Sequence, residues 1–418
     1  MSKLITNKKT YIVTTSLPYV NSIPHIGFAF EAVIADTISR YLRSIGKKVV
    51  FISGTDDNSF KLALKAKESG EETQSFINDF AGEYLGLQEK LCLSYDIFYR
   101  TSSKSHGNFV NKYIDSIDKG LIFQKYFRSY FCQDCESFVG FDIPEPKICK
   151  YHNKPYILID ENNYFLRVDD NSKEKLLTNI NSKVFIPESA KDESISLCEK
   201  FTDFNFTREN KHQWGIVYKK DKNYVFYSFF DALLGYIGAA EYKKTDWDSN
   251  DICIIQNIGR DILKFHSIYF PFMLTISGKK HTPVYLLVHG FVNKNGEKMS
   301  KSKNNLVSVN DLLISYDKYV IRIYLLSKNI SEDFEFILNE IINISNIYKK
   351  YLVYFSEEIR KFKKGNVTNI DFHENMLQFQ FSNIVNKFIL IIKNNDSFEK
   401  LCQSDRVFIK EFSLVFIH

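Results

Sequence analysis

Between positions 10 and 70, short apolar runs alternate with longer segments that have helical spacing. Residues 10–16 (TYIVTTS) and 47–54 (KKVVFISG) are apolar and β-branched, as buried strands are. Residues 28–46 (FAFEAVIADTISRYLRSIG) and 56–70 (DDNSFKLALKAKESG) repeat apolar positions at helical intervals. This order predicts an α/β protein with a parallel, doubly wound sheet, which binds ligands beyond the carboxyl ends of its strands.

The ends of these two helices carry capping signals. Gly46 and Gly70 follow the last apolar positions and are expected to stop the helices. Asp57 and Asn58 are short polar residues, and either is expected to cap the start of the second helix.

The composition bounds the class of protein. A chain of 418 residues, of which 44% are hydrophobic and 25% charged, is expected to be an ordinary globular protein of more than one domain. The sequence has no secretory leader pattern and no long uncharged apolar span, so we expect a cytoplasmic protein that does not contact a membrane. A net charge of +5 permits a nucleic-acid partner but does not require one.

Changes of pattern along the chain predict its organisation. Residues 1–118 form the first half of a Rossmann-like catalytic domain, and residues 228–310 supply strands and helices of the same kind for its second half. Between them, residues 119–227 are richer in turns, cysteine pairs and short aromatic strands, which indicates a connective insertion. Residues 311–418 have helical spacing to the end.

Two short motifs suggest phosphate binding. In Pro24–Phe30 (PHIGFAF), Gly27 would let the backbone approach a ligand, the helix N-terminus would offer free N–H groups, and His25 could donate to a phosphate oxygen. In Glu297–Ser302 (EKMSKS), two lysines on a loop beside a glycine could close over a leaving pyrophosphate. Each motif alone also fits a plainer structure, a turn before a core helix or a solvated basic loop.

Taken together and in this order, the motifs resemble those of class I aminoacyl-tRNA synthetases, and the resemblance narrows to the methionyl-tRNA synthetase family. It extends over about residues 8–335. The blocks that carry it are, in order, TTSLPYVNSIPHIGF, FISGTDD, YDIFYRTSSKSH, ENNYFLR, FDALLGY, IGRDILKFHSIYFPFML and VHGFVNKNGEKMSKS. The resemblance implies a ligase that uses ATP and Mg²⁺ to convert an amino acid, methionine or an analogue, to an aminoacyl adenylate and transfers it to tRNA. It also implies a split Rossmann-like sheet followed by a helical anticodon-type bundle.

The resemblance also assigns roles to residues. For catalysis it implies His25, Lys298 and Lys301. Asp56 matches the carboxylate that pairs with the substrate ammonium group. The implied ATP-binding residues are His25, Gly27, Gly259, Lys298, Ser300 and Lys301. The implied amino-acid-binding residues are Leu17, Tyr19, Asp56, Phe229, Ala232, Tyr236, Phe265 and His266.

Two cysteine-containing knuckles lie in the expected insertion. Cys132 and Cys135 are followed after thirteen residues by Cys149 and His152. Three thiolates and an imidazole at this spacing are a closed tetrahedral set for structural zinc, and the alternative is buried free cysteines. The resemblance implies a zinc knuckle at this place.

The chain departs from the family pattern at four places. Phe28 stands where a second histidine or another polar group is usual, and a phenyl ring cannot donate to a phosphate. Asn58-Ser59 replaces His-Gly, and Phe229 replaces a tryptophan of the side-chain pocket, which leaves the choice of amino acid open. Gln256 and Arg260 occupy positions of a usual histidine and lysine.

The C-terminal region departs as well, because the chain's two tryptophans, Trp214 and Trp247, both precede it. The family reads the anticodon with a tryptophan, so we expect a shortened or altered bundle. Three hypotheses follow. The chain charges tRNA, it is a standalone paralogue that transfers the amino acid to an amine or hydroxylamine in specialised metabolism, or it is a non-catalytic binding protein. The two lysines of KMSKS argue against the third.

Overall fold

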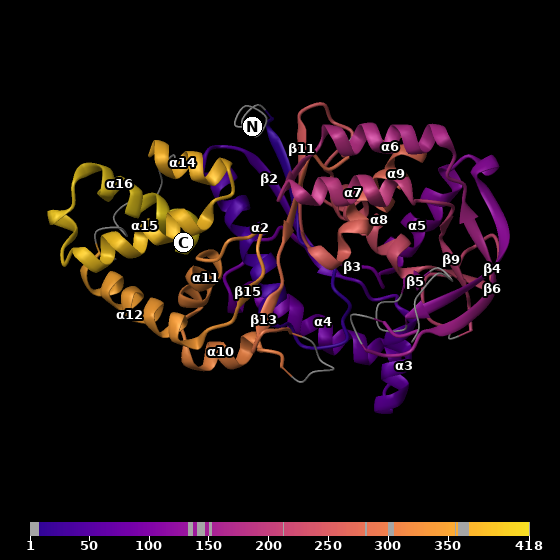
Figure 1. Ribbon diagram of the computed structural model, residues 1–418, viewed down its shortest axis with the longest axis horizontal. Coiled ribbons are helices and arrows are strands. Elements are labelled where there is room, and N and C mark those ends of the chain that lie inside the picture. Colours follow the sequence, from indigo (N-terminus) through magenta and orange to yellow (C-terminus); the bar gives the residue numbers. More distant parts are fainter. Residues whose placement is uncertain are drawn as a thin grey trace.

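The centre of the computed structural model is a six-stranded sheet, in the order β3-β2-β1-β11-β12-β7, whose neighbours all run parallel (Figure 1). This confirms the predicted α/β fold with a parallel sheet. The strands are β1 (Thr10–Thr14), β2 (Lys48–Thr55), β3 (Ile97–Arg100), β7 (Val184–Ile186), β11 (Ile252–Gly259) and β12 (Tyr285–His289). The structure describes residues 8–132, 137–139, 147–149, 153–211, 213–280, 282–299, 305–355, 357 and 368–417.

The strand order reverses between β1 and β11. From β1 the chain moves outward through β2 to β3, and after the insertion it returns to β1's other side and continues through β12. The central pair is in register from Thr10 opposite Ile252 to Thr14 opposite Gln256. A crevice opens at the carboxyl ends of strands where the order reverses, so the sheet itself places a ligand site after β1 and β11.

Helices cover both faces of the sheet. Because side chains alternate along a strand, Tyr11 and Val13 pack in one core with helix α2 (Ile26–Ser44), whereas Ile12 packs in the other core with helix α8 (Ser228–Tyr242). Other helices of this part are α3 (Phe60–Ser69), α4 (Thr73–Lys90), α5 (Lys104–Ser116), α6 (Asp170–Ser182), α7 (Ser189–Glu199) and α9 (Phe270–Ile276).

The first residue of α3 corrects one expectation. Ser59 caps this helix, with its hydroxyl accepting from the amide of Lys61, and neither Asp57 nor Asn58 does so. The carboxylate of Asp57 instead binds Arg100, and the side-chain amide of Asn58 donates to Asp231 in α8. Both candidate side chains therefore bind residues distant in sequence and do not cap the helix. Gly70 ends the helix with φ of 74°, as predicted.

The segment between β3 and β11 contains an antiparallel sheet, on the right in Figure 1. Its longest pairing joins β4 to β6, from Ile122 opposite Leu166 to Phe131 opposite Ile157. The segment assigned to the insertion also supplies β7, which pairs with β12 at the edge of the main sheet. The strands are β4 (Ile122–Cys132), β5 (Ser137–Val139), β6 (Ile157–Leu166) and β8 (Phe204–Asn205), with a separate hairpin of β9 (Thr207–Glu209) and β10 (Tyr224–Phe226).

The C-terminal part is helical, as predicted, and lies on the left in Figure 1. Within the described ranges, no helix is both long enough and apolar enough to cross a membrane. The elements are α10 (Val309–Ser315), α11 (Lys318–Leu326), α12 (Leu338–Tyr354), α14 (Ile370–Leu377), α15 (Phe381–Asn394), α16 (Gln403–Phe412) and the π-helical turn η6 (Ser413–Ile417).

A fully buried ion pair ties α2 to these helices. Asp36 of α2 lies 2.7 Å from the guanidinium of Arg322 in α11, and neither side chain is exposed. Burial alone would raise the pKa of Asp36, but the charges of Arg322 and Arg40 outweigh it and hold the pKa below its ordinary value. Ser94 donates its amide and hydroxyl to the same carboxylate, each at 2.6 Å.

We expect Asp36→Asn to lower the free energy of unfolding by about 3–5 kcal/mol, because the substitution leaves the Arg322 charge buried without its counter-ion. Urea unfolding followed by circular dichroism measures this. The matched control is Asp371→Asn, which breaks the exposed 2.6 Å pair with Lys387 and is expected to change stability by at most about 1 kcal/mol. If both substitutions lowered the free energy of unfolding equally, the buried pair would contribute no more to stability than the exposed one.

Candidate active site

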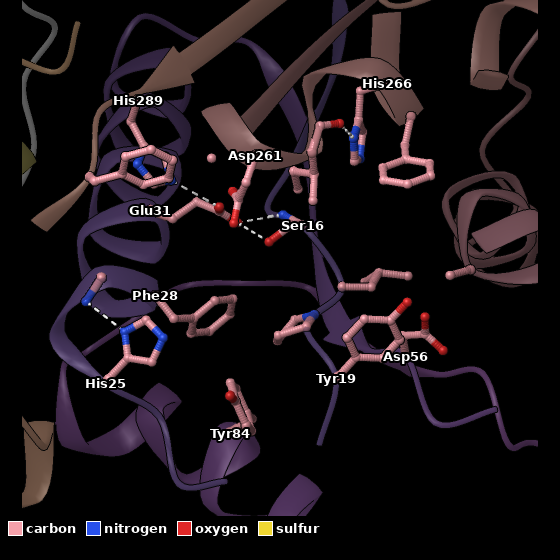
Figure 2. Close-up of a pocket in the computed structure, with 18 of the residues that line it drawn as sticks. Ser16, Tyr19, His25, Phe28, Glu31, Asp56, Tyr84, Asp261, His266 and His289 are labelled. Carbon is pink, nitrogen blue, oxygen red and sulfur yellow. Dashed lines mark hydrogen bonds and ion pairs between the residues drawn. The ribbon is translucent and has the colours of Figure 1, made fainter. Parts of the chain in front are cut away.

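A cavity of about 350 Å³ lies at the carboxyl ends of the central strands, where the strand order reverses (Figure 2). Its wall contains residues that follow β1, β2, β11 and β12, together with the start of α2. The sequence-predicted residues in the wall are Leu17, Tyr19, His25, Gly27, Asp56, Phe229, Ala232, Tyr236, Gly259, Phe265, His266 and Lys298. Ser300 and Lys301 were also predicted and lie outside the described residues.

His25 begins α2 and caps it. Its Nδ1 accepts a hydrogen bond from the amide of Gly27 at 3.1 Å, so the ring proton of the neutral form is on Nε2. A Cβ on Gly27 would lie 2.9 Å from this ring, so a larger residue there would displace the His25 ring from its capping position. A helix N-terminus with a histidine donor beside it favours an anionic ligand.

Phe28 follows this cap and lines the cavity. Its ring meets that of Tyr84 from α4 edge-on, with centroids 5.1 Å apart and an angle of 73° between the planes. Figure 2 shows both rings on the same side of the cavity as His25. The departure from the family pattern therefore replaces a polar group of the wall with an aromatic pair.

Lys298 lies in the wall on a short hairpin. Strand β13 (Val292–Lys294) pairs with β14 (Glu297–Lys298), and Asn295 and Gly296 turn between them with positive φ. The ammonium group of Lys298 lies 3.1 Å from Asp261 and 3.6 Å from the centroid of the Phe291 ring. The lysine is thus held at the cavity, and an anion entering there would compete with the carboxylate of Asp261.

Three residues that the sequence reasoning missed form a network in the same wall. The carboxylate of Glu31 in α2 accepts from the amide and hydroxyl of Ser16 at 2.5 and 2.6 Å, and its other oxygen lies 3.1 Å from Nε2 of His289. Figure 2 shows the three side chains converging. A glutamate inside the apolar run FAFEAVIA is the signal that could have revealed it, because a buried carboxylate requires partners.

Asp56 lies at the opposite end of the cavity from α2. It follows β2 and is 2% exposed, its amide donates to the carbonyl of Pro18, and its carboxylate accepts from the amide of Asn58 at 3.3 Å. The side chain of Asn58 is anchored in turn by Asp231 at 2.7 Å and by the carbonyl of Thr101 at 2.9 Å. Asp56 therefore has a fixed backbone and a carboxylate suited to an ammonium group.

Tyr236 and His266 close this end with a neutral hydrogen bond. The tyrosine hydroxyl and Nε2 of His266 are 2.9 Å apart, and Nδ1 of His266 is 3.1 Å from the carbonyl of Ile262. Since a carbonyl only accepts, Nδ1 carries the proton and Nε2 accepts from Tyr236. Burial lowers the pKa of His266 to about 4, so the imidazole is neutral near neutral pH.

Aromatic rings form the remaining wall. Phe229 and Phe265 stack with centroids 3.8 Å apart, and Tyr19 lies 6.0 Å from Phe229. An apolar, aromatic enclosure beside one carboxylate is suited to an amino acid with a flexible, polarizable side chain such as a thioether.

The predicted zinc ligands are only partly within the described residues. Cys132 ends β4 and is 3% exposed, and Cys149 is 1% exposed. The carbonyl of Cys149 accepts from the amide of Asn153 at 2.8 Å. Cys135 and His152 lie outside the described residues. Among the side chains that the structure describes, no group of three or more histidine, cysteine or acidic residues could hold a metal ion.

Comparison with known proteins gives the class. The family model described as tRNA synthetases class I (M) matches residues 11–140 and 139–348. The fold is also that of a solved structure, a Mycobacterium tuberculosis methionyl-tRNA synthetase in complex with methionyl-adenylate. The TM-score is 0.80 at 22% identity, over 97% of this chain and 89% of that one. The sequence match places the chain in the class I tRNA synthetase family.

Curated relatives give the branch of that class. The chain is 33% identical over 333 residues to the methionine–tRNA ligase of Thermosynechococcus vestitus, which covers 76% of this chain and 62% of the relative. It is 32% identical over 350 residues to that of Synechocystis, covering 81% and 65%. The chain belongs to the methionine–tRNA ligase family, and it spans about half to two thirds of the length of these relatives.

We expect nitrogen NMR of the His266 ring to show a neutral imidazole down to about pH 5, since its pKa is about 4 in the folded protein. The unfolded chain takes up this proton near pH 6.5, so His266 lowers stability as pH falls from 6.5 toward 4. The matched variant Tyr236→Phe removes the partner of Nε2 without adding charge. A ring that titrates near 6.5 in the folded protein would contradict this account.

Proposed function

We propose that this chain activates methionine with ATP, forming methionyl adenylate and pyrophosphate, and transfers the methionyl group to tRNA. The observation that carries the proposal is one cavity with two chemically different ends. A helix N-terminus, His25 and Lys298 favour phosphate at one end, and Asp56 with an aromatic enclosure favours an amino acid at the other. The family membership of the chain supports the same reaction.

In the activation step, a carboxylate oxygen of the amino acid attacks the α-phosphorus of ATP and the bond to the β-phosphate oxygen breaks. The step requires no protein nucleophile, only in-line positioning and compensation of the growing negative charge. Asp56 would hold the ammonium group and so aim the carboxylate. ATP enters as its Mg²⁺ complex, which belongs to the substrate.

At the phosphate end, His25 would donate from Nε2, and the positive end of the α2 dipole would favour the triphosphate. Lys298 would leave Asp261 for the leaving pyrophosphate, which Lys301 would also steady, and Ser300 would help to shape the nucleotide pocket. Gly259 would keep the nucleotide side of the cavity open, because a Cβ there would lie 2.8 Å from the carboxylate of Asp261. Phe28 offers no donor, so the remaining donors would carry the phosphate charge.

The end of the cavity that contains Tyr236 and His266 would select the side chain of the amino acid. A neutral His266–Tyr236 pair would place a hydroxyl and an imidazole beside the side chain without a net charge, which suits a thioether better than a charged group. Leu17, Ala232 and the Phe229–Phe265 stack would complete the apolar enclosure. Phe229 of this stack stands where a tryptophan is usual in the family, so methionine and longer analogues are the substrates to compare.

The first experiment is ATP–pyrophosphate exchange over the twenty standard amino acids, with methionine expected to support it. We expect Lys298→Ala to lower kcat on the order of 10²–10³-fold, because it removes a charge that stabilises the leaving group. Lys294→Ala, on the same hairpin but outside the cavity wall, is the control and should retain activity. Exchange with no amino acid would overturn the proposal.

The acceptor separates the two enzymatic hypotheses. The second candidate is transfer of the aminoacyl group to a small amine or hydroxylamine. Charging of total tRNA with labelled methionine decides for tRNA. Exchange activity without charging, together with hydroxamate formation faster than the solution reaction of methionyl adenylate with hydroxylamine, decides for the alternative.

We propose that Cys132, Cys135, Cys149 and His152 hold one structural zinc ion. The two buried thiols of Cys132 and Cys149 fit such a site, in which zinc would supply folding energy and no chemistry. Metal analysis is expected to find one zinc per chain, and Cys149→Ser to lose it together with local stability. The control is Cys402→Ser, which changes an exposed thiol in the C-terminal helices. Zinc-free protein with unchanged stability would contradict the site.

A further inference from the structure

The network of Glu31, Ser16 and His289 joins three segments that are distant in sequence. Glu31 is in α2, Ser16 follows β1, and His289 is the last residue of β12, directly before the hairpin that carries Lys298. The side chain of Asn257, from β11, adds a 2.7 Å hydrogen bond to the carbonyl of Glu31. Glu31 therefore forms hydrogen bonds with each of the segments that meet where the strand order reverses.

The hydrogen bonds of His289 define its charge. Nδ1 lies 2.8 Å from the carbonyl of Gly290, and Nε2 lies 3.1 Å from the carboxylate of Glu31. Both partners are acceptors, and only an imidazolium carries a proton on each ring nitrogen. The arrangement is therefore a buried ion pair, with Glu31 4% and His289 7% exposed.

Electrostatics agree with this geometry. Burial alone would lower the pKa of His289, but the hydrogen bond and charge of Glu31 outweigh it and hold the pKa above its ordinary value. Among the described residues, the other titratable group that faces His289 is Asp261, which is paired with Lys298. Arg260, next to it, pairs with Asp333 at 3.6 Å.

The base of the hairpin is in contact with the chain on two sides. Gly290 follows His289 and presses against the backbone of Glu332, where a Cβ would lie 2.1 Å from the carbonyl oxygen. Its amide donates to the carbonyl of Ile330 at 3.0 Å. One side of the hairpin base is thus fixed by backbone packing, and the cavity side is held by the His289–Glu31 contact.

We propose that Glu31 and His289 are positioning residues for ATP: their ion pair holds the base of the Lys298 hairpin against α2, and nucleotide use weakens when the pair is deprotonated. The inference rests on the proposed function, since Lys298 matters only if a phosphate binds there. The pair is complete below the ordinary histidine pKa of 6.5 and is lost as pH rises through the raised pKa of His289.

The decisive variants are Glu31→Gln and His289→Gln. Glu31→Gln removes the charge, so kcat/KM for ATP is expected to fall on the order of 10- to 100-fold while KM for methionine stays unchanged. His289→Gln keeps a donor toward Glu31 but cannot titrate, so the alkaline loss of kcat/KM for ATP should disappear. Asp371→Asn, an acid-to-amide change at an exposed pair in the C-terminal helices, is the control.

A second readout does not depend on activity. The chain has nine histidines, and loss of one signal in His289→Gln assigns the ring in nitrogen NMR. In the native chain that ring should titrate above 6.5, and in Glu31→Gln its pKa should fall. An imidazole that is neutral in the native chain, or a pH profile unchanged in both variants, would overturn the inference. If no amino acid supports exchange, the proposed function fails, while this titration still decides the ion pair.

Discussion

The ion pair between Asp36 and Arg322 is the interaction on which the arrangement of this chain depends. Two charges without solvent exposure are tolerated only when every partner is in place. Here the carboxylate receives Arg322, Arg40 and two donors from Ser94. Arg322 also donates to the carbonyls of Leu91 and Phe416, each at 3.1 Å. Arg322 therefore links α2 to Leu91, the residue after α4, and to η6 at the end of the C-terminal helices.

Helix α2 contacts three different parts of the molecule along its length. Its first residues, after the His25 cap, place the positive end of the helix dipole at the cavity. Glu31, about one turn further, joins β1 and β12, and Asp36 joins the C-terminal helices. Because the helix is rigid, its N-terminal end at the cavity is held at a fixed distance from the networks of Glu31 and Asp36. The apolar residues between these positions fill the core against the sheet.

The sequence allowed the parallel sheet, a ligand site beyond its strand ends and twelve residues of the cavity wall to be predicted, because strand periodicity and short motifs are local. Twelve predicted residues line one cavity, although they come from segments as distant as Leu17 and Lys298. The contacts of Glu31 with His289 were not predictable from local pattern, since the residues are 258 positions apart. The start of α3 was mispredicted for the same reason, because Asp57 and Asn58 are taken by Arg100 and Asp231.

The departures from the family pattern fall on two different ends of the cavity, and their physical consequences differ. Phe28 removes a donor from the phosphate end, where Lys298 and the Glu31–His289 pair remain as charges. Phe229 alters an apolar wall at the neutral end, where it stacks on Phe265 and changes shape without changing charge. A loss of donors acts on the rate of phosphate chemistry, whereas a change of shape acts on the choice of side chain. Activity and specificity of this chain are therefore expected to vary independently, each with its own end of the cavity.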